Sequence, residues 1–200
     1  MASMNQARGG TMAGLWSDSH TPMTWSGVKA KLAALEAKEL LSLVGDLYRL
    51  SKENQAFLDA RCAASADPLH HYKKIISDSL YPDVQKNKPI QIAKAKMAVS
   101  DYKKAAADPQ GEVELMVYFV EQGNDCTLDY GDIDGPFYDA LILMYGRAVD
   151  QLLSLPKNAR EPFRRRLAAI LNSSAHIGWA YPDELRDHYK RGFGDQDLDD

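Results

Sequence analysis

The residues with the clearest capacity for chemistry lie in one short stretch, residues 124–135, which reads NDCTLDYGDIDG. Besides the phenol of Tyr130 it holds four carboxylates, those of Asp125, Asp129, Asp132 and Asp134. Clustered oxygen ligands suit Ca²⁺ and Mg²⁺, but the spacing does not fit an EF-hand. If Gly135 takes the required glycine position, Tyr130 falls on the first ligand position and Leu141 replaces the bidentate Glu. The stretch therefore predicts neither a metal site nor a cofactor.

A structural role explains part of the same stretch. Asp134 directly precedes Gly135 and Pro136, a pattern typical of a helix N-cap followed by proline in the first turn. Carboxylates near a helix start are also favoured by the helix dipole. Capping does not account for Asp129, Tyr130 and Asp132, so we predict that these three residues face a ligand or partner.

A basic run follows about 25 residues later along the chain. It comprises Lys157, Arg160, Arg164, Arg165 and Arg166. Such a run could bind phosphate or an acidic partner surface. On a helix whose buried side is set by Phe163 and Leu167, however, Arg165 points away while Arg160 and Arg164 flank that side, which favours a solvated face. We include these three arginines in the predicted partner surface, and they could also reach the acidic stretch as one ion-pair network.

Other catalytic patterns are incomplete in this sequence. His70 and His71 are adjacent, so on a helix they diverge by about 100° and cannot chelate one ion as an i, i+4 pair would. Cys62 and Cys126 have no CxxC spacing and no His-Asn context, which favours reduced thiols in the cytoplasm. No GxSxG, SxxK or glycine-rich phosphate loop occurs. The prediction therefore leans away from an enzyme.

Composition narrows the class of protein further. A chain of 200 residues with 45% hydrophobic content can form one domain with a sizeable core. Because the net charge is −4, we do not expect the protein to bind nucleic acid. No run of 18 apolar residues exists, so no membrane span is predicted. A protein partner is the remaining expectation, with the oligomeric state left open.

Hydrophobic periodicity predicts an all-α fold of about nine short-linked helices, which form antiparallel hairpins in an irregular bundle or a solenoid-like stack. Residues 1–24 are rich in Gly, Ser, Thr and Met and read as a disordered extension, 25–190 as a single helical domain, and 191–200 as an acidic tail.

Individual helices follow from the same periodicity. A wide apolar stripe over 38–50 predicts a helix buried on most sides, and the next helix is expected to turn Phe57, Leu58 and Cys62 inward. Asp67 and Pro68 have the pattern of an N-cap and a first helical residue. Residues 112–122 would suit a strand or a buried helix, and the absence of a partner strand favours the helix.

Residues Gly123 and Asn124 fit the end of that helix, after which the acidic stretch forms a turn. Further helices are expected over 136–155, 160–177 and 182–189. The acidic stretch would thus connect the two most buried helices of the protein.

Three tracts of the sequence resemble a bacterial all-helical domain family of unknown function. They are LLSLVGDLYRLSKENQAFLDAR (40–61), IQIAKAKMAVSDYKKA (90–105) and ELMVYFVEQGNDCTLDYGDIDGPFYDALILMYGRAV (114–149). The resemblance covers about residues 38–153. It implies a small intracellular bacterial protein and supplies no activity or catalytic residue.

Two hypotheses of function follow from these observations. The first is a non-enzymatic cytosolic helical module that binds or scaffolds a protein partner. The alternative is an enzyme or nucleic-acid-related protein with its site at residues 124–135. That alternative predicts a deep pocket in which Asp129, Asp132 or Asp134 lies beside His176 or an arginine.

Overall fold

The computed structural model describes residues 24–62, 64, 66–83, 86 and 88–194. Their secondary structure is entirely helical, in nine α-helices, which confirms the all-α prediction. The predicted disordered extension, except for its last residue, and positions 195–200 of the predicted acidic tail lie outside the described residues. The chain divides into two compact units, residues 1–46 and 47–200.

The first unit contains α1 (Trp25–Leu32) and most of α2 (Ala37–Leu50). Thr24 occupies the N-cap position of α1 without a side-chain capping bond, and Ser26 lies inside the helix. α2 has no buried residue, and Leu41 is 72% exposed, so the prediction of a helix buried on most sides was wrong. The physical reason is that α2 has too little surface to pack against. Among the described residues of this unit, the helix beside α2 is α1, which is eight residues long and has no buried side chain. An apolar stripe shows what a helix could bury, not that a surface is present to cover it.

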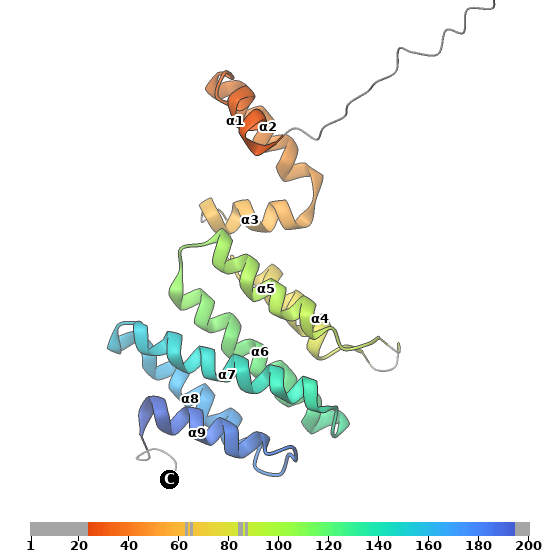
Figure 1. The fold of residues 1–200 in the computed structure, drawn as a ribbon, viewed down its shortest axis with the longest axis vertical. Helices are drawn as coiled ribbons and strands as arrows, with labels where there is room; N and C mark the ends of the chain where they lie inside the picture. Colours follow the sequence, from red (N-terminus) through yellow and green to blue (C-terminus); the bar gives the residue numbers. More distant parts are fainter. Residues whose placement is uncertain (1–23, 63, 65, 84–85, 87, 195–200) are drawn as a thin grey trace, which may run out of the picture. The chain divides into compact units, whose positions relative to one another are not determined.

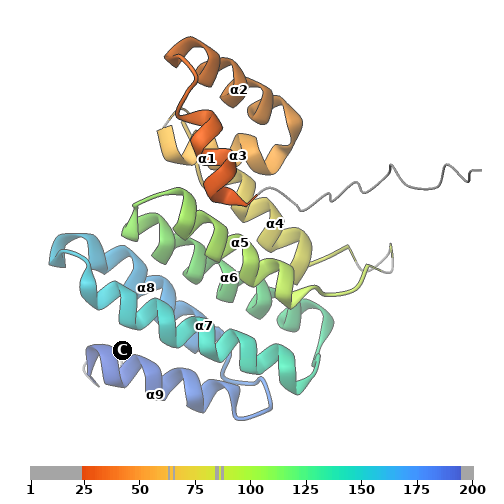
Figure 2. The ribbon, with the colours of Figure 1, turned by 45° about the horizontal axis from the view of Figure 1, so that its top comes forward.

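The second unit contains the other seven helices. They are α3 (Lys52–Cys62), α4 (His70–Leu80), α5 (Ile92–Ala105), α6 (Pro109–Tyr130), α7 (Gly135–Ser154), α8 (Lys157–Ser173) and α9 (Tyr181–Phe193). From α4 onward they form three hairpins, α4–α5, α6–α7 and α8–α9, stacked one on the next (Figures 1 and 2). α4 and α5 pack on α6, while α8 packs on α6 and α9 on α7. The middle hairpin therefore contacts both of its neighbours.

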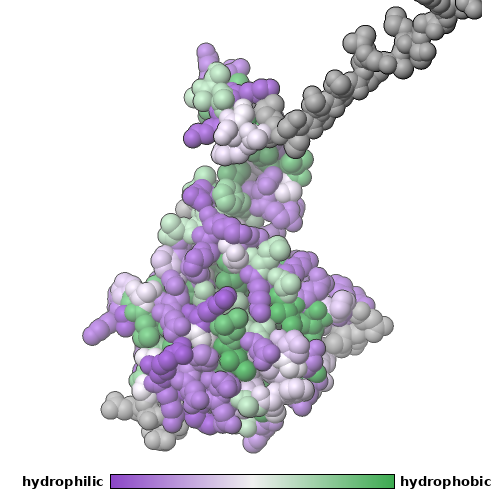
Figure 3. Space-filling view, viewed as in Figure 1, coloured by the Kyte–Doolittle hydropathy of each residue, from purple (hydrophilic) through white to green (hydrophobic). Residues whose placement is uncertain are grey.

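The hydrophobic core runs through these three hairpins. Phe119, Leu141, Leu167 and Leu185 have no exposed surface. The hydroxyl of buried Tyr145 donates to the carbonyl of Leu167 at 3.0 Å, which satisfies its polar group. Figure 3 shows a mainly hydrophilic surface over this stack, interrupted by hydrophobic patches.

α3 contributes little to that core. Only Ala56 of this helix is buried, Phe57 is 41% exposed, and Cys62 is exposed. The prediction that Phe57, Leu58 and Cys62 turn inward was therefore wrong for Phe57 and Cys62, while Leu58 is half-buried. α3 packs mainly against α5, and the residue of α3 that this packing buries is Ala56.

Two aspartates are the N-caps of the helices of the middle hairpin. Asp134 accepts a hydrogen bond from the backbone N–H of Phe137 at 2.9 Å, so the predicted N-cap of α7 is present. Asp108 caps α6 in the same way, with Oδ1 accepting from the N–H of Gly111 at 3.0 Å. Its second oxygen, Oδ2, accepts from the hydroxyl of buried Tyr102 at 2.7 Å. Asp108 thus links the start of α6 to the side of α5.

α6 does not end at Gly123 and Asn124 but continues to Tyr130, so the predicted stop was wrong. A Cβ placed on Gly123 would lie 2.3 Å from Cδ2 of Leu141, which shows that the glycine allows α6 and α7 to approach closely. Asn124 is buried and donates from Nδ2 to Ser173 Oγ at 3.0 Å. Because α6 is longer than predicted, the turn between the two helices shortens to residues 131–134.

Other helix boundaries also differ from the predicted ones. α4 begins at His70, and Asp67 Oδ1 instead accepts from the N–H of Leu69 at 3.1 Å, so Asp67 and Pro68 form a turn before the helix. α9 extends to Phe193, beyond the predicted domain end at 190.

Candidate functional site

Acidic and aromatic residues gather where the junction of α6 and α7 meets the end of α4 and the loop between α8 and α9. This group is here named the acid-aromatic corner: Tyr81, Asp129, Tyr130, Asp132 and Trp179. All of them are exposed except Tyr81, which is half-buried. The Tyr81 hydroxyl donates a hydrogen bond to Asp129 Oδ2, and the rings of Tyr81 and Tyr130 lie 5.6 Å apart between centroids. The hydrogen bond to Asp129, with smaller contributions from desolvation and from the Asp129 charge, raises the pKa of Tyr81 to about 12. Tyr81 therefore remains a protonated donor at neutral pH.

The other half of the corner is built on buried Tyr138. Its hydroxyl donates to Asp132 Oδ1 at 3.2 Å, and its ring stacks on Trp179 with centroids 6.0 Å apart and planes inclined by 25°. A Cβ on Gly135 would lie 3.5 Å from the Trp179 ring, so the indole also lies close to the start of α7. Trp179 nevertheless remains 56% exposed. Its ring is thus supported on one side and open to solvent on the other.

The backbone that presents Trp179 is unusual. Trp179 and Ala180 have φ of 65° and 54°, a left-handed conformation that costs a non-glycine residue about 1–2 kcal/mol. Hydrogen bonds from Ile177 N–H to the Ser174 carbonyl (2.8 Å) and from Tyr181 N–H to the Gly178 carbonyl (3.2 Å) hold the loop between α8 and α9. The position of the indole is therefore fixed by backbone bonds as well as by stacking.

The predicted arginines lie elsewhere. Arg160 donates from Nε to the Leu155 carbonyl and from Nη2 to the Leu153 carbonyl, both at 2.7 Å, and so caps the last carbonyls of α7. Arg164 and Arg165 pair with Glu161 of their own helix at 2.9 and 2.8 Å.

The prediction of one network between these arginines and the acidic stretch was therefore wrong. α7 has 20 residues and carries the chain about 30 Å from the corner before the basic run begins. The helix predicted over 136–155 already implies this separation, which the prediction of one network did not take into account.

Arg166, the last residue of the basic run, has a different role. It forms two hydrogen bonds to Glu121, each 2.7 Å, and also contacts Glu114, which Lys73 contacts at 2.7 Å. This network joins α4, α6 and α8. Burial alone would raise the pKa of Glu114, but the hydrogen bonds from Arg166 and Lys73 outweigh it and lower that pKa.

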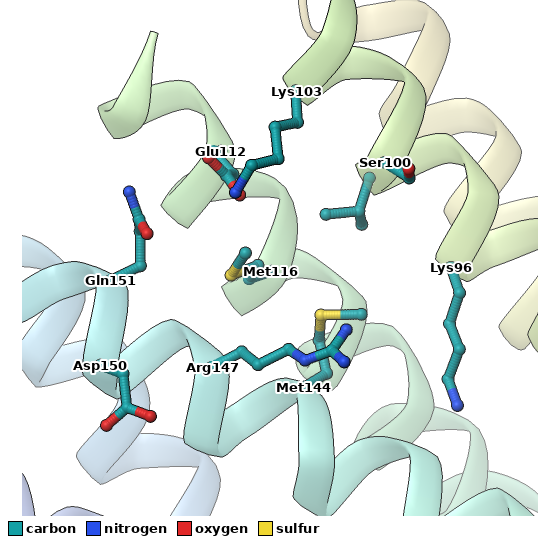
Figure 4. Close-up of a pocket in the computed structure, with 10 residues that line it drawn as sticks. Lys96, Ser100, Lys103, Glu112, Met116, Met144, Arg147, Asp150 and Gln151 are labelled. Atoms are coloured by element: carbon teal, nitrogen blue, oxygen red, sulfur yellow. The ribbon is translucent and has the colours of Figure 1, made fainter.

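A groove lies between α5 and α7, with α6 behind it (Figure 4). Its volume is about 450 Å³, within the usual range for small-molecule sites. Three buried apolar residues form its floor: Val99, Met116 and Met144. Polar and charged side chains line its walls, namely Lys96, Ser100, Lys103, Glu112, Arg147, Asp150 and Gln151.

The charges of the groove are unequally paired. Lys103 contacts Glu112 at 2.7 Å, and Asp150 contacts Arg191 of α9 at 3.0 Å, so both carboxylates are neutralised. In the described part of the chain, no hydrogen bond or ion pair joins the side chain of Lys96 or Arg147 to another residue. The groove thus has two uncompensated cations, one on each wall.

Sequence reasoning missed this groove. Lys96, Ser100 and Lys103 have i, i+4, i+7 spacing, which places them on one face of a helix. Arg147 and Gln151 are likewise i, i+4 on the helix expected from 136. Both patterns were visible, but neither shows that the two faces lie opposite each other across α6.

The alternative hypothesis requires a pocket at the acidic stretch. Asp129, Asp132 and Asp134 are all exposed, and they line neither the groove nor the two hollows beside α3, of about 400 and 290 Å³. Across the described ranges no group of three His, Cys, Asp or Glu side chains is arranged to hold a metal ion. Within the same ranges, every helix is too short or too polar to cross a bilayer.

Neither a protein-family model, nor a curated protein, nor a solved structure matches this chain. The resemblance to a bacterial helical family over residues 38–153 therefore stays a prediction.

Proposed function

We propose that this chain is a non-enzymatic helical module that binds a protein partner through the acid-aromatic corner. The observation that carries the proposal is Trp179, which is 56% exposed although its backbone and one ring face are fixed. Trp and Tyr dominate the binding energy of many interfaces, since they bury a large area at little entropic cost. Tyr130, which is 48% exposed, adds a second exposed aromatic ring to the corner.

The charge of the corner selects the partner. No ion pair joins Asp129 or Asp132 to a cation among the described residues, so both carboxylates are available. Burial, followed by the charges of Glu121 and Asp129, raises the pKa of nearby Asp125. A basic segment of a partner would meet these carboxylates and could stack a Lys or Arg on the indole.

The compartment proposed for this module is the bacterial cytoplasm. Cys62 is exposed and Cys126 is buried, and both are free thiols in the structure. Free thiols, one of them exposed, suit a reducing compartment.

The proposal can be tested by affinity capture of partners at low and high salt. Trp179→Ala removes the indole but keeps a Cβ at the left-handed position, so the backbone strain is unchanged. Asp129→Asn with Asp132→Asn removes two charges while preserving the side-chain size. Arg164→Gln with Arg165→Gln is the matched control, because it also removes two charges, one half-buried and one exposed, but on α8.

The expected result is a protein retained by the wild type and the control, weakened by salt, and lost from both corner variants. Circular dichroism would verify that the variants are folded. Retention of that protein by both corner variants, or enrichment of no partner at any salt concentration, would contradict the proposal.

A further inference from the structure

We propose that the groove between α5 and α7 binds a phosphate monoester that carries an apolar group. This site is separate from the acid-aromatic corner and does not depend on the function proposed for it. The argument rests on the two uncompensated cations, the apolar floor and the positions of the paired carboxylates.

The two free cations are arranged to share one anion. In Figure 4 the guanidinium of Arg147 extends over Met144 toward the middle of the groove, and Lys96 projects from α5 on the facing wall. The planar guanidinium can donate two parallel hydrogen bonds to an anion, whereas the ammonium acts as a compact point charge. Ser100 lies on the same wall as Lys96, one helical turn further along α5.

Charge balance favours a phosphate monoester over a carboxylate. A monoester carries about −1.5 to −2 charges near pH 7, which matches two cations, while a carboxylate balances only one. Its three terminal oxygens also exceed the two of a carboxylate and so suffice for the paired donors of Arg147 together with Lys96.

The residues in the rest of the groove indicate what the non-phosphate part of the ligand is. Val99, Met116 and Met144 form an apolar floor, and methionine adapts readily to the shape of an apolar group. A volume of about 450 Å³ holds a small molecule rather than a polymer.

The negative residues of the groove limit the number of anionic groups. Glu112 and Asp150 lie toward the end of the groove marked by Gln151. Each already has a cationic partner, Lys103 and Arg191 respectively. A second phosphate at that end would meet carboxylates and no free cation, so the site fits a monoester and disfavours a polyphosphate or a nucleic-acid backbone.

The experiment is a titration of the full chain with phenyl phosphate. Calorimetry measures the affinity, and NMR of the methionine methyl groups shows where the ligand binds. The chain has seven methionines, so Met116 and Met144 report on the groove and the others serve as internal references. Shifts at Met116 and Met144, with binding at least about tenfold tighter than that of inorganic phosphate or benzoate, are expected because only the monoester uses both the charge and the floor.

Variants locate the site. Arg147→Gln and Lys96→Gln should each weaken phenyl phosphate binding about tenfold or more. Arg186→Gln is the matched control, since it removes an exposed arginine from α9 and should leave the affinity unchanged. Neither Arg147 nor Lys96 is buried, so the variants are expected to fold.

Vesicles containing phosphatidic acid distinguish the source of the monoester. Binding of these vesicles that is lost in Arg147→Gln would support a lipid source, and binding of phenyl phosphate without the vesicles would support a soluble one. The proposal is overturned if neither probe shifts Met116 and Met144, if Arg147→Gln binds as the wild type does, or if benzoate binds equally well.

Discussion

Asp108 is the residue whose removal should most clearly weaken the middle of the fold. Its Oδ1 caps α6 at the Gly111 N–H, and its Oδ2 accepts from Tyr102, which is 1% exposed. Loss of an N-cap costs about 1 kcal/mol. A buried hydroxyl left without its partner costs about 1–3 kcal/mol. Asp108→Ala is therefore expected to lower the free energy of unfolding by about 2–4 kcal/mol.

Two further variants separate these contributions. Asp108→Asn has one carbonyl oxygen and can accept only one of the two hydrogen bonds, so it should fall between the wild type and Asp108→Ala. Tyr102→Phe removes the hydroxyl that Asp108→Ala would leave unpaired. In that background Asp108→Ala should cost only the cap, about 1 kcal/mol, and the double-mutant cycle should show a coupling of about 1–3 kcal/mol.

The assay is urea unfolding followed by far-ultraviolet circular dichroism, with free energies from linear extrapolation. Asp101→Ala is the matched control: it removes an exposed aspartate of α5 whose ion pair with Lys104 is short-range, so its effect should stay within about 0.5 kcal/mol. A value for Asp108→Ala as small as that of the control, or a coupling near zero with Tyr102→Phe, would refute the reasoning.

Two other predictions concern protonation and thiol reactivity. Because the pKa of Glu114 is lowered in the folded state, its ion pairs with Arg166 and Lys73 stabilise the protein above about pH 4.5, and that contribution disappears as the pH falls through the lowered pKa. Glu114→Gln should therefore be less stable than the wild type at pH 7, with the difference closing in acid; a difference independent of pH, measured by urea unfolding, would be inconsistent with this. Exposed Cys62 should react at once with a chromogenic disulfide reagent, whereas Cys126, whose pKa burial raises to about 11, should react only after unfolding. Rapid labelling of two thiols per native chain would show this assignment to be wrong.

The sequence predicts the parts of this fold that depend on nearby residues. Asp134 was predicted as an N-cap because its hydrogen bond to Phe137 spans only three residues. Gly123 was predicted as a helix end because glycine often occupies that position. Its true role is set by Leu141, which belongs to the facing helix. Tertiary packing therefore decided what the local pattern left open.

The candidate sites show the same limit. Asp129, Tyr130 and Asp132 were singled out because capping did not explain them, and the structure shows all three exposed at one corner. Trp179 was missed, since its contact with Tyr138 joins residues 41 positions apart. Lys96 and Arg147 are 51 positions apart and come together only because α5 and α7 flank α6.

The stacking of the three hairpins also determines how the protein should come apart. In a stack whose members contact their neighbours, stability is a sum of each member's own stability and the shared interfaces. The middle hairpin has two such interfaces, whereas α8–α9, at the end of the chain, has one. Backbone amides of α6 and α7 should thus exchange with deuterium last, after those of α9. Glu114 adds a link across the stack, because the same carboxylate contacts Lys73 of one outer hairpin and Arg166 of the other.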